Sequence, residues 1–206
     1  MPTDVFFDLD GTLTDPYEGI SRSIRHALEH FDVPVPGAST LRGFIGPPLY
    51  DTFTELLGEG KAEKAVNVYR ERFARIGWRE NVPYAGIGDV LAELEKAGRR
   101  LFVATSKPRV FAERIVEHFG LAGHFTEVYG AELDGTRGDK TELLEWALAR
   151  GACGEQAVMI GDRRHDMIGA TNNNMFAIGV TWGYGSIDEL ESAGAQRIAH
   201  VPEDIT

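Results

Sequence analysis

The chain has 206 residues, 43% of them hydrophobic and 26% charged, and it carries a formal net charge of −11. This length allows one sizeable core, or a core domain with a smaller insert, and the composition is typical of a soluble globular protein. The acidic balance argues against nucleic acid and anionic membranes as main partners, because both require a basic surface. The first residues have no leader-like pattern and no stretch approaches ~20 apolar residues, so we expect a cytoplasmic protein. Cys153 is the only cysteine, which excludes an internal disulfide.

Short apolar segments alternate with amphipathic helical patterns along most of the chain. The helical patterns repeat apolar residues at helical spacing before a glycine, as in Val90, Leu91 and Leu94 before Gly98. This alternation predicts an α/β fold, a Rossmann-like parallel sheet with helices on both faces. We expect its strands at residues 4–9, 100–105, 127–131, 157–160, 175–181 and 197–201.

The first expected strand ends in two carboxylates, Asp8 and Asp10, followed by Gly11. Ligands of open α/β sheets bind at the carboxyl ends of the strands, and residues two apart on an extended segment share a side. Two adjacent carboxylates repel each other, so a bound cation or a reaction would justify them. Gly11 allows backbone N–H groups to approach an anion closely. The alternative is an acidic turn after a strand.

Residues 14–83 break the alternation, because they have helical periodicity but no convincing strand. We expect a helical bundle inserted after the first strand of a core domain formed by residues 1–13 and 84–206. Its exits, near Asp15-Pro16 and Pro83–Gly86, are rich in turn residues and could act as hinges. We favour a mobile cap over a decoration that only buries surface, because the insert leaves the chain beside the carboxylates. Its three apolar stripes are Ile20, Ile24, Ala27, Leu28 and Phe31; Leu49, Phe53, Leu56 and Leu57; and Ala62, Ala65, Val66, Tyr69 and Phe73.

Two further segments carry groups that suit a bound anion. Thr105 and Ser106 end the second core strand just before a helix, and a helix N-terminus is a ready anion site. Lys140 stands at the head of a later helix, where a cation is poorly placed with respect to the helix dipole. This position calls for some other benefit, unless Lys140 is ordinary solvated surface charge.

Carboxylates also follow the fourth expected strand, at Asp162 and Asp166. Their spacing lets both side chains point into one crevice, and hard oxygen ligands suit Mg²⁺, which takes one or two carboxylates and keeps several waters. The alternative is an acidic helix cap. Two acidic strand ends in one chain favour the metal.

The segment Trp182-Gly183-Tyr184-Gly185 follows the fifth expected strand. Its aromatic rings could stack on a leaving group, or they could pack beside the site. The sequence does not choose between these two roles.

These segments, in this order, resemble the haloacid dehalogenase superfamily of phosphohydrolases over nearly the whole chain. The insert resembles that superfamily's C1-type cap, and residues 42–49 and 105–108 are similar to its phosphoglycolate phosphatase-like branch. One departure is the Asn172-Asn173-Asn174 run, which we expect to affect the turn into the next strand rather than the chemistry. The motifs that carry the resemblance are Asp8-x-Asp10-Gly11-Thr12, Thr105, Lys140 and Gly161-Asp162-x-x-x-Asp166.

The resemblance implies a Mg²⁺-dependent phosphatase that acts on a small phosphorylated metabolite such as phosphoglycolate, a nucleotide or a sugar phosphate. Asp8 would attack phosphorus and form an aspartyl phosphate. Asp10 would protonate the leaving oxygen and then take a proton from the hydrolytic water, so its pKa should be raised. Lys140 would neutralise the crowded anions.

The resemblance also implies which residues bind the metal and the substrate. Mg²⁺ would be bound by the Asp8 carboxylate, the Asp10 backbone carbonyl and Asp162, with Asp166 acting through water or by orienting its neighbours. The phosphoryl oxygens would be held by Thr105, Lys140 and the backbone N–H groups of Leu9, Asp10 and Ser106. In the cap, the residues expected at the leaving group are Arg42, Phe44, Gly46 and Pro47.

Several other activities stay open. A phosphosugar mutase would use the same Asp8 and Asp10 but retain the phosphoryl group, whereas a dehalogenase needs no acid such as Asp10. A phosphonate hydrolase would need a Schiff-base lysine, and Lys61 and Lys64 lie on a face of the insert that the pattern predicts to be solvated. A phospho-accepting signalling receiver would be shorter and would lack the insert, and an inactive binding protein would not need every catalytic side chain. We expect a monomer by default, with a dimer as the alternative.

Overall fold

The computed structural model describes residues 4–151 and 157–206, so Cys153 lies outside the described residues. The chain forms two compact units. The first, called the core unit below, consists of residues 1–15 and 83–206. The second, called the helical unit, consists of residues 16–82.

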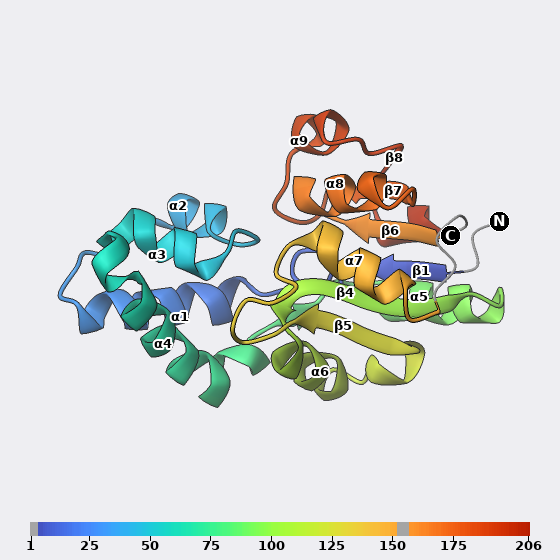
Figure 1. The fold of residues 1–206 in the computed structure, drawn as a ribbon. Coiled ribbons are helices and arrows are strands. Elements are labelled where there is room, and N and C mark those ends of the chain that lie inside the picture. Colours follow the sequence, from blue (N-terminus) through green and yellow to red (C-terminus); the bar gives the residue numbers. More distant parts are fainter. Residues whose placement is uncertain (1–3, 152–156) are drawn as a thin grey trace. The chain divides into compact units, whose positions relative to one another are not determined.

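A six-stranded sheet forms the centre of the core unit, and every adjacent pair of its strands is parallel (Figure 1). This finding confirms the predicted α/β fold, and the strands lie where the apolar segments predicted them. In spatial order, the strands are β5 (Glu127–Ala131), β4 (Arg100–Pro108), β1 (Asp4–Phe7), β6 (Ala157–Gly161), β7 (Phe176–Val180) and β8 (Arg197–Ala199).

Helices flank this sheet. They are α5 (Ile87–Lys96), α6 (Arg109–His118), α7 (Lys140–Leu148), α8 (Arg164–Asn172) and α9 (Ile187–Ser192), with short 3₁₀ turns η2 (Ala122–His124) and η4 (Pro202–Ile205). Leu143 of α7, Met167 of α8 and Leu190 of α9 share one buried cluster with Phe6 and Met159 of the sheet. All four residues of β1 are buried, as expected for a strand covered on both faces. Burial of this apolar surface is the main force that holds the sheet and its helices together.

The register of the sheet determines where the functional side chains gather. Phe7 pairs with Val103 on one neighbouring strand and with Ile160 on the other. Because these strands are parallel, the residues that follow β1, β4 and β6 emerge at the same edge. Those are the segments that carry the predicted site residues.

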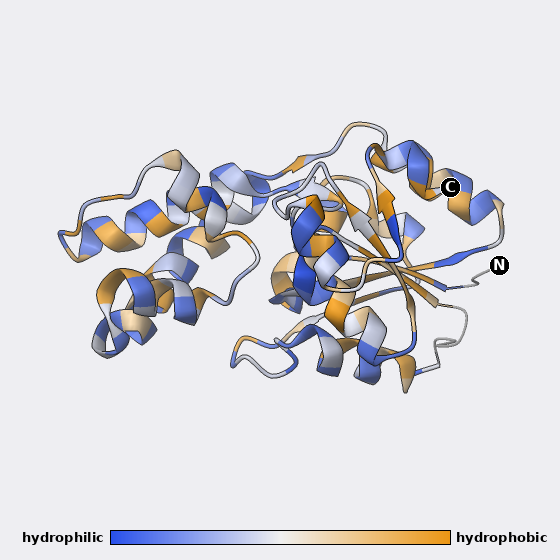
Figure 2. Cartoon of the chain, turned by 90° about the horizontal axis from the view of Figure 1, so that it is seen from above, coloured by the Kyte–Doolittle hydropathy of each residue, from blue (hydrophilic) through white to orange (hydrophobic). Residues whose placement is uncertain are grey.

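The helical unit contains α1 (Tyr17–His30), α2 (Ala38–Gly43), α3 (Leu49–Leu57), α4 (Glu59–Arg75) and the 3₁₀ turn η1 (Gly77–Arg79). The three apolar stripes of the sequence lie on α1, α3 and α4, except for Phe31, which directly follows α1, and most of their members are buried. Tyr69 stacks on Phe73 with ring centroids 5.5 Å apart, and Phe53 meets Tyr69 edge-on at 6.2 Å. Figure 2 shows hydrophobic and hydrophilic residues alternating along these helices, as amphipathic packing requires.

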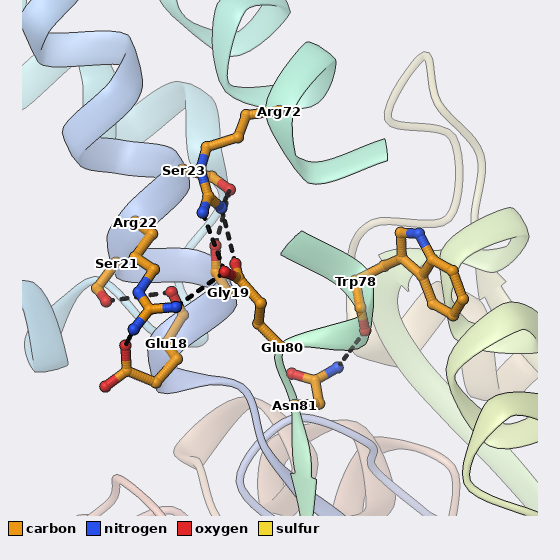
Figure 3. A network of polar contacts seen from close by, with 9 residues as sticks. All are labelled: Glu18, Gly19, Ser21, Arg22, Ser23, Arg72, Trp78, Glu80 and Asn81. Atoms are coloured by element: carbon orange, nitrogen blue, oxygen red, sulfur yellow. Dashed lines mark hydrogen bonds and ion pairs between the residues drawn. The ribbon is translucent and has the colours of Figure 1, made fainter. Parts of the chain in front are cut away.

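A polar network ties together α1, α4 and the segment after η1 (Figure 3). Arg72 donates two hydrogen bonds to the Glu80 carboxylate, at 2.8 and 3.1 Å, and Arg22 donates a third at 2.9 Å. Arg72 also donates to the Ser23 hydroxyl, which donates to the Gly19 carbonyl. The hydrogen bond from Arg72 outweighs the effect of burial and keeps the pKa of Glu80 below its ordinary value.

Two very short strands, β2 (Thr14–Asp15) and β3 (Val82–Pro83), form a two-stranded sheet of their own. They lie at the two points where the chain passes between the units. Two residues are too few to show strand periodicity, so no pattern in the sequence predicts these strands. Within the described part of the chain, no helix has the length and apolar character needed to cross a membrane.

Candidate active site

Lys140 lies at the centre of the site. It is the first residue of α7, and the helix begins there because the Asp139 carboxylate caps it, accepting from the N–H groups of Thr141 and Glu142 at 2.8 and 3.1 Å. The Lys140 side chain is buried, so it is not ordinary surface charge. Its ammonium donates to Asp8 Oδ1 at 2.9 Å and to the Ala104 carbonyl at 2.7 Å, and it pairs with Asp166 Oδ1 at 2.8 Å.

The two carboxylates compensate for the cost of burying this charge. Burial by itself lowers the pKa of Lys140, but the nearby Asp166 and Asp8 outweigh it and raise that pKa above its ordinary value. Lys140 is therefore a permanent cation between Asp8, which follows β1, and Asp166 of α8. These two ion pairs explain why a lysine stands at a position where the helix dipole disfavours a cation.

Asp8, Asp162 and Asp166 form a cluster of three buried carboxylates, with one oxygen of each within 4.8 Å of the others. Burial raises the pKa of Asp162 well above its ordinary value, and the neighbouring Asp166 and Asp8 raise it further. Burial likewise raises the pKa of Asp166 to about 6. Three carboxylates against one ammonium leave negative charge in excess, which is costly in a buried site unless a cation compensates it. Hard oxygen donors in this arrangement fit Mg²⁺.

Asp10 is not one of the three carboxylates of that cluster, and its partner is a different lysine. Its Oδ2 pairs with the Lys107 ammonium, and both side chains are largely buried. Burial raises the pKa of Asp10, with Lys107 opposing the shift and Asp8 adding to it. Its other oxygen, Oδ1, is buried without a hydrogen-bond partner among the described residues. A carboxyl group in this setting is suited to hold and release a proton.

The residues predicted to bind phosphate lie at the same edge of the sheet. Thr105 is buried near the end of β4, two residues beyond the Val103 that pairs with Phe7. Its hydroxyl accepts from the Lys107 N–H at 3.2 Å. Leu9 is fully buried directly after Asp8, and Ser106 is half-buried.

The residues predicted to contact the leaving group lie in the helical unit. The Arg42 guanidinium stands 5.1 Å from the centre of the Tyr17 ring, and Gly46 has a positive φ of 106°. Phe44 and Pro47 line a groove of about 370 Å³ within this unit. The other residues of its lining are Thr40, Gly43, Asp51, Thr52 and Glu55.

The sequence does not predict the partner of Asp10 or the contacts of the segment at 182–185. A lysine beside a strand end, such as Lys107, has no distinguishing pattern. For the segment at 182–185, the sequence leaves two roles open. Trp182 Nε1–H donates to the Thr12 carbonyl at 3.1 Å, and the Tyr184 N–H donates to Asp162 Oδ2 at 2.8 Å. Both residues pack beside the site.

Comparison with known proteins places this geometry in a family. Residues 5–180 match the family model of the haloacid dehalogenase-like hydrolases. A 5'-nucleotidase of Pseudomonas aeruginosa is 49% identical over 191 residues, which cover 91% of this chain and 86% of that protein. The tyrosine-protein kinase PtkA of Mycobacterium tuberculosis is 44% identical over 97% of this chain and 69% of its own length.

The fold agrees with this placement. A crystal structure described as a predicted phosphatase from Clostridium acetobutylicum superposes with a TM-score of 0.94 at 43% identity, covering 100% of this chain and 96% of that one. The match to the family model covers most of the chain. The chain belongs to the haloacid dehalogenase-like hydrolases, and within that family it is a phosphatase.

Proposed function

We propose that this phosphatase depends on Mg²⁺ and hydrolyses a small phosphate monoester through an aspartyl phosphate on Asp8. The observation that carries the proposal is the buried contact of the Lys140 ammonium with Asp8 and Asp166, beside Asp162. A buried, acid-rich cluster with one lysine is costly for stability alone, and such sites are typical of catalysis.

Asp8, Asp162 and Asp166 are the side chains that would hold the metal, together with the backbone carbonyl of Asp10. When bound, Mg²⁺ supplies positive charge against the phosphoryl oxygens and the attacking carboxylate. The protein's part is to hold these carboxylates in place. Lys140 does so for Asp8 and Asp166, because its ammonium pairs with both, at 2.9 and 2.8 Å.

In the first step, an Asp8 carboxylate oxygen attacks phosphorus in line with the leaving oxygen. The new bond joins Asp8 to phosphorus as the bond to the leaving oxygen breaks, and Asp10 gives its proton to that oxygen. The raised pKa of Asp10 supports this role, since burial favours its protonated form. The alcohol product then departs.

In the second step, a water molecule attacks the phosphorus of the aspartyl phosphate. Asp10, now ionised, takes a proton from this water, and the bond from Asp8 to phosphorus breaks. Inorganic phosphate leaves and Asp8 is restored as a carboxylate. Thr105, Lys140 and the N–H groups of Leu9, Asp10 and Ser106 would hold the phosphoryl oxygens through both steps.

The substrate class that we put first is the nucleoside 5'-monophosphates, on the strength of the relative named a 5'-nucleotidase at 49% identity. Arg42, Phe44, Gly46 and Pro47 of the helical unit are our candidates for contacting the leaving group. The test is phosphate release from a panel of nucleotides, phosphoglycolate, pyrophosphate and sugar phosphates, with Mg²⁺ and with chelator. We expect release with Mg²⁺ only and a preference for nucleotides. Equal rates with chelator would overturn the metal requirement, and a preference for another ester would overturn the substrate.

The relative named a tyrosine-protein kinase calls for a second measurement, of phosphoryl transfer from ATP to a tyrosine-containing peptide. Both activities begin with phosphoryl transfer, but a kinase passes the group from ATP to tyrosine rather than to water. We expect inorganic phosphate to be the product and no label to pass from ATP to a tyrosine-containing peptide. The Asp8→Asn variant should lose phosphate release, because an amide cannot form the acyl phosphate. A fully active Asp8→Asn protein would overturn the covalent mechanism.

A further inference from the structure

Residues Trp182–Gly185, which we call the 182–185 loop, follow β7 and contact the site beside Asp162. The Tyr184 N–H donates to Asp162 Oδ2 at 2.8 Å, and the Trp182 indole donates to the Thr12 carbonyl at 3.1 Å. The Thr12 hydroxyl donates to Asp162 Oδ1 at 3.4 Å. One oxygen of Asp162 is therefore held by the loop, and the other by a residue that the loop itself holds.

The loop packs so closely that its backbone and Asp162 determine each other's position. A Cβ atom added at Gly183 would lie 2.4 Å from the Asp162 Cβ and Oδ2 and from the Gly11 carbonyl oxygen. A Cβ atom added at Gly185 would lie 2.0 Å from the Asp162 carbonyl oxygen. These distances are far inside van der Waals contact, so a side chain at either position must displace the loop or Asp162.

The loop also reaches the point where the chain leaves the core unit. The Tyr184 hydroxyl donates a hydrogen bond to Asp15 Oδ1. Asp15 is the last residue of the core unit before the chain enters the helical unit, and it belongs to β2. Tyr184 thus contacts Asp162 through its backbone and Asp15 through its side chain.

We propose that Tyr184 is a positioning residue for Asp162, and that the 182–185 loop couples the affinity for the metal to the position of Asp15. The inference rests on the proposed Mg²⁺ site. It follows that a change at Asp15 alters the affinity for the metal. By the same coupling, metal binding alters the position of Asp15. Altering a group that hydrogen-bonds to a metal ligand, and so orients it without touching the metal, typically changes the affinity for the metal.

The first test measures Mg²⁺ binding to the full chain by isothermal titration calorimetry, with no substrate present. We expect Gly183→Ala to weaken Mg²⁺ binding about 10-fold or more, because the added methyl group displaces Asp162. Gly88→Ala on α5 is the matched control, since a Cβ atom there meets nothing within 4 Å. Thermal unfolding of both variants checks that the fold is retained. Wild-type affinity in a folded Gly183→Ala protein would overturn the proposal.

The second test does not depend on the fold of the glycine variant. Tyr184→Phe and Asp15→Ala each remove one partner of the hydrogen bond and keep the Tyr184 N–H. We expect each to weaken Mg²⁺ binding roughly 2–10-fold, the range of one hydrogen bond, and the double variant to bind no more weakly than either single one. Unchanged affinities, or additive losses in the double variant, would overturn the coupling. A wild-type chain that binds no Mg²⁺ would instead overturn the proposed metal site, so the two failures are distinguishable.

Discussion

Lys107 forms a buried ion pair with Asp10, the residue that we propose as the proton donor. The pair favours the ionised form of Asp10, whereas burial favours the protonated form, and the net pKa is raised. Asp10 has to act in both forms during one turnover. Lys107 therefore shifts the balance between the two forms toward the ionised one.

We predict that Lys107→Met moves the alkaline limb of the kcat/KM profile to higher pH. Without the ammonium, the pKa of Asp10 rises further, so the acid stays protonated to higher pH. The measurement is a pH–rate profile with a nucleotide substrate. Lys96→Met, at an exposed position of α5, is the control and should leave the limb unchanged. An alkaline limb that stays in place in Lys107→Met would show that Lys107 does not govern this proton.

Removal of Lys140 should destabilise the metal-free protein as well as inactivate it. Lys140→Met leaves Asp8 and Asp166 buried without their cation, and breaking a buried pair in this way typically costs ~3–5 kcal/mol. Urea unfolding in the presence of chelator measures this loss. The exposed Lys96→Met variant again serves as control. A loss below ~1 kcal/mol would mean that the ammonium does not compensate the carboxylates.

The contribution of Asp166 to the stability of the metal-free protein should fall as the pH rises from about 4 to about 6. Burial holds the pKa of Asp166 at about 6, against an ordinary value of 3.8. Between these values the folded protein binds more protons than the unfolded chain, so each rise in pH favours unfolding. The contribution is complete below the lower value and is lost as the pH passes the upper one.

The check on this prediction is a series of thermal unfolding curves with chelator, compared with Asp166→Asn. The variant lacks the titrating group, so the melting temperature of the wild type should fall relative to that of the variant as the pH rises through that window. Added Mg²⁺ should raise the melting temperature of the wild type more at neutral pH than at pH 5, because the metal needs ionised carboxylates. Identical slopes in wild type and variant would contradict the assignment.

In the helical unit, Glu80→Ala should lower stability by ~1–3 kcal/mol, since it leaves Arg72 without its two hydrogen bonds in a largely buried site. The control is Glu18→Ala, which removes an exposed ion pair with Arg22 and should cost less than ~1 kcal/mol. Because the Arg72 hydrogen bond depresses the pKa of Glu80, its contribution is present above the unfolded value and is lost as the pH falls. Chemical unfolding of both variants decides the matter, and equal losses would contradict the role given to this network.

Much of the fold could be predicted from the sequence, because the buried faces of strands and helices require apolar residues at regular spacings. The six strands of the core sheet coincide with short apolar runs, and the long helices of the insert carry apolar residues at helical spacing. The short strands β2 and β3 and the helix α2 escaped prediction. Two residues cannot show an alternation, and the six residues of α2 make fewer than two helical turns.

The site could be predicted only where side chains follow a strand end. Two of the predicted side chains, Asp8 and Asp162, directly follow a strand. Two others, Asp166 and Lys140, lie in the first turn of a helix, and the structure brings all four together. The pairing of Lys107 with Asp10 joins residues 97 positions apart, and no local pattern marks it. The contact of Tyr184 with Asp162 is made by a backbone N–H, which leaves no trace in residue type.

The nucleophilic role of Asp8 is tested most directly by trapping the covalent intermediate. Enzyme turning over substrate with Mg²⁺ is quenched in acid and treated with borohydride, which reduces an acyl phosphate to the alcohol, and the peptides are examined by mass spectrometry. We predict homoserine at position 8 in these samples and aspartate there in samples without substrate. Unmodified aspartate at position 8 during active turnover, or reduction at another carboxylate instead, would contradict the mechanism.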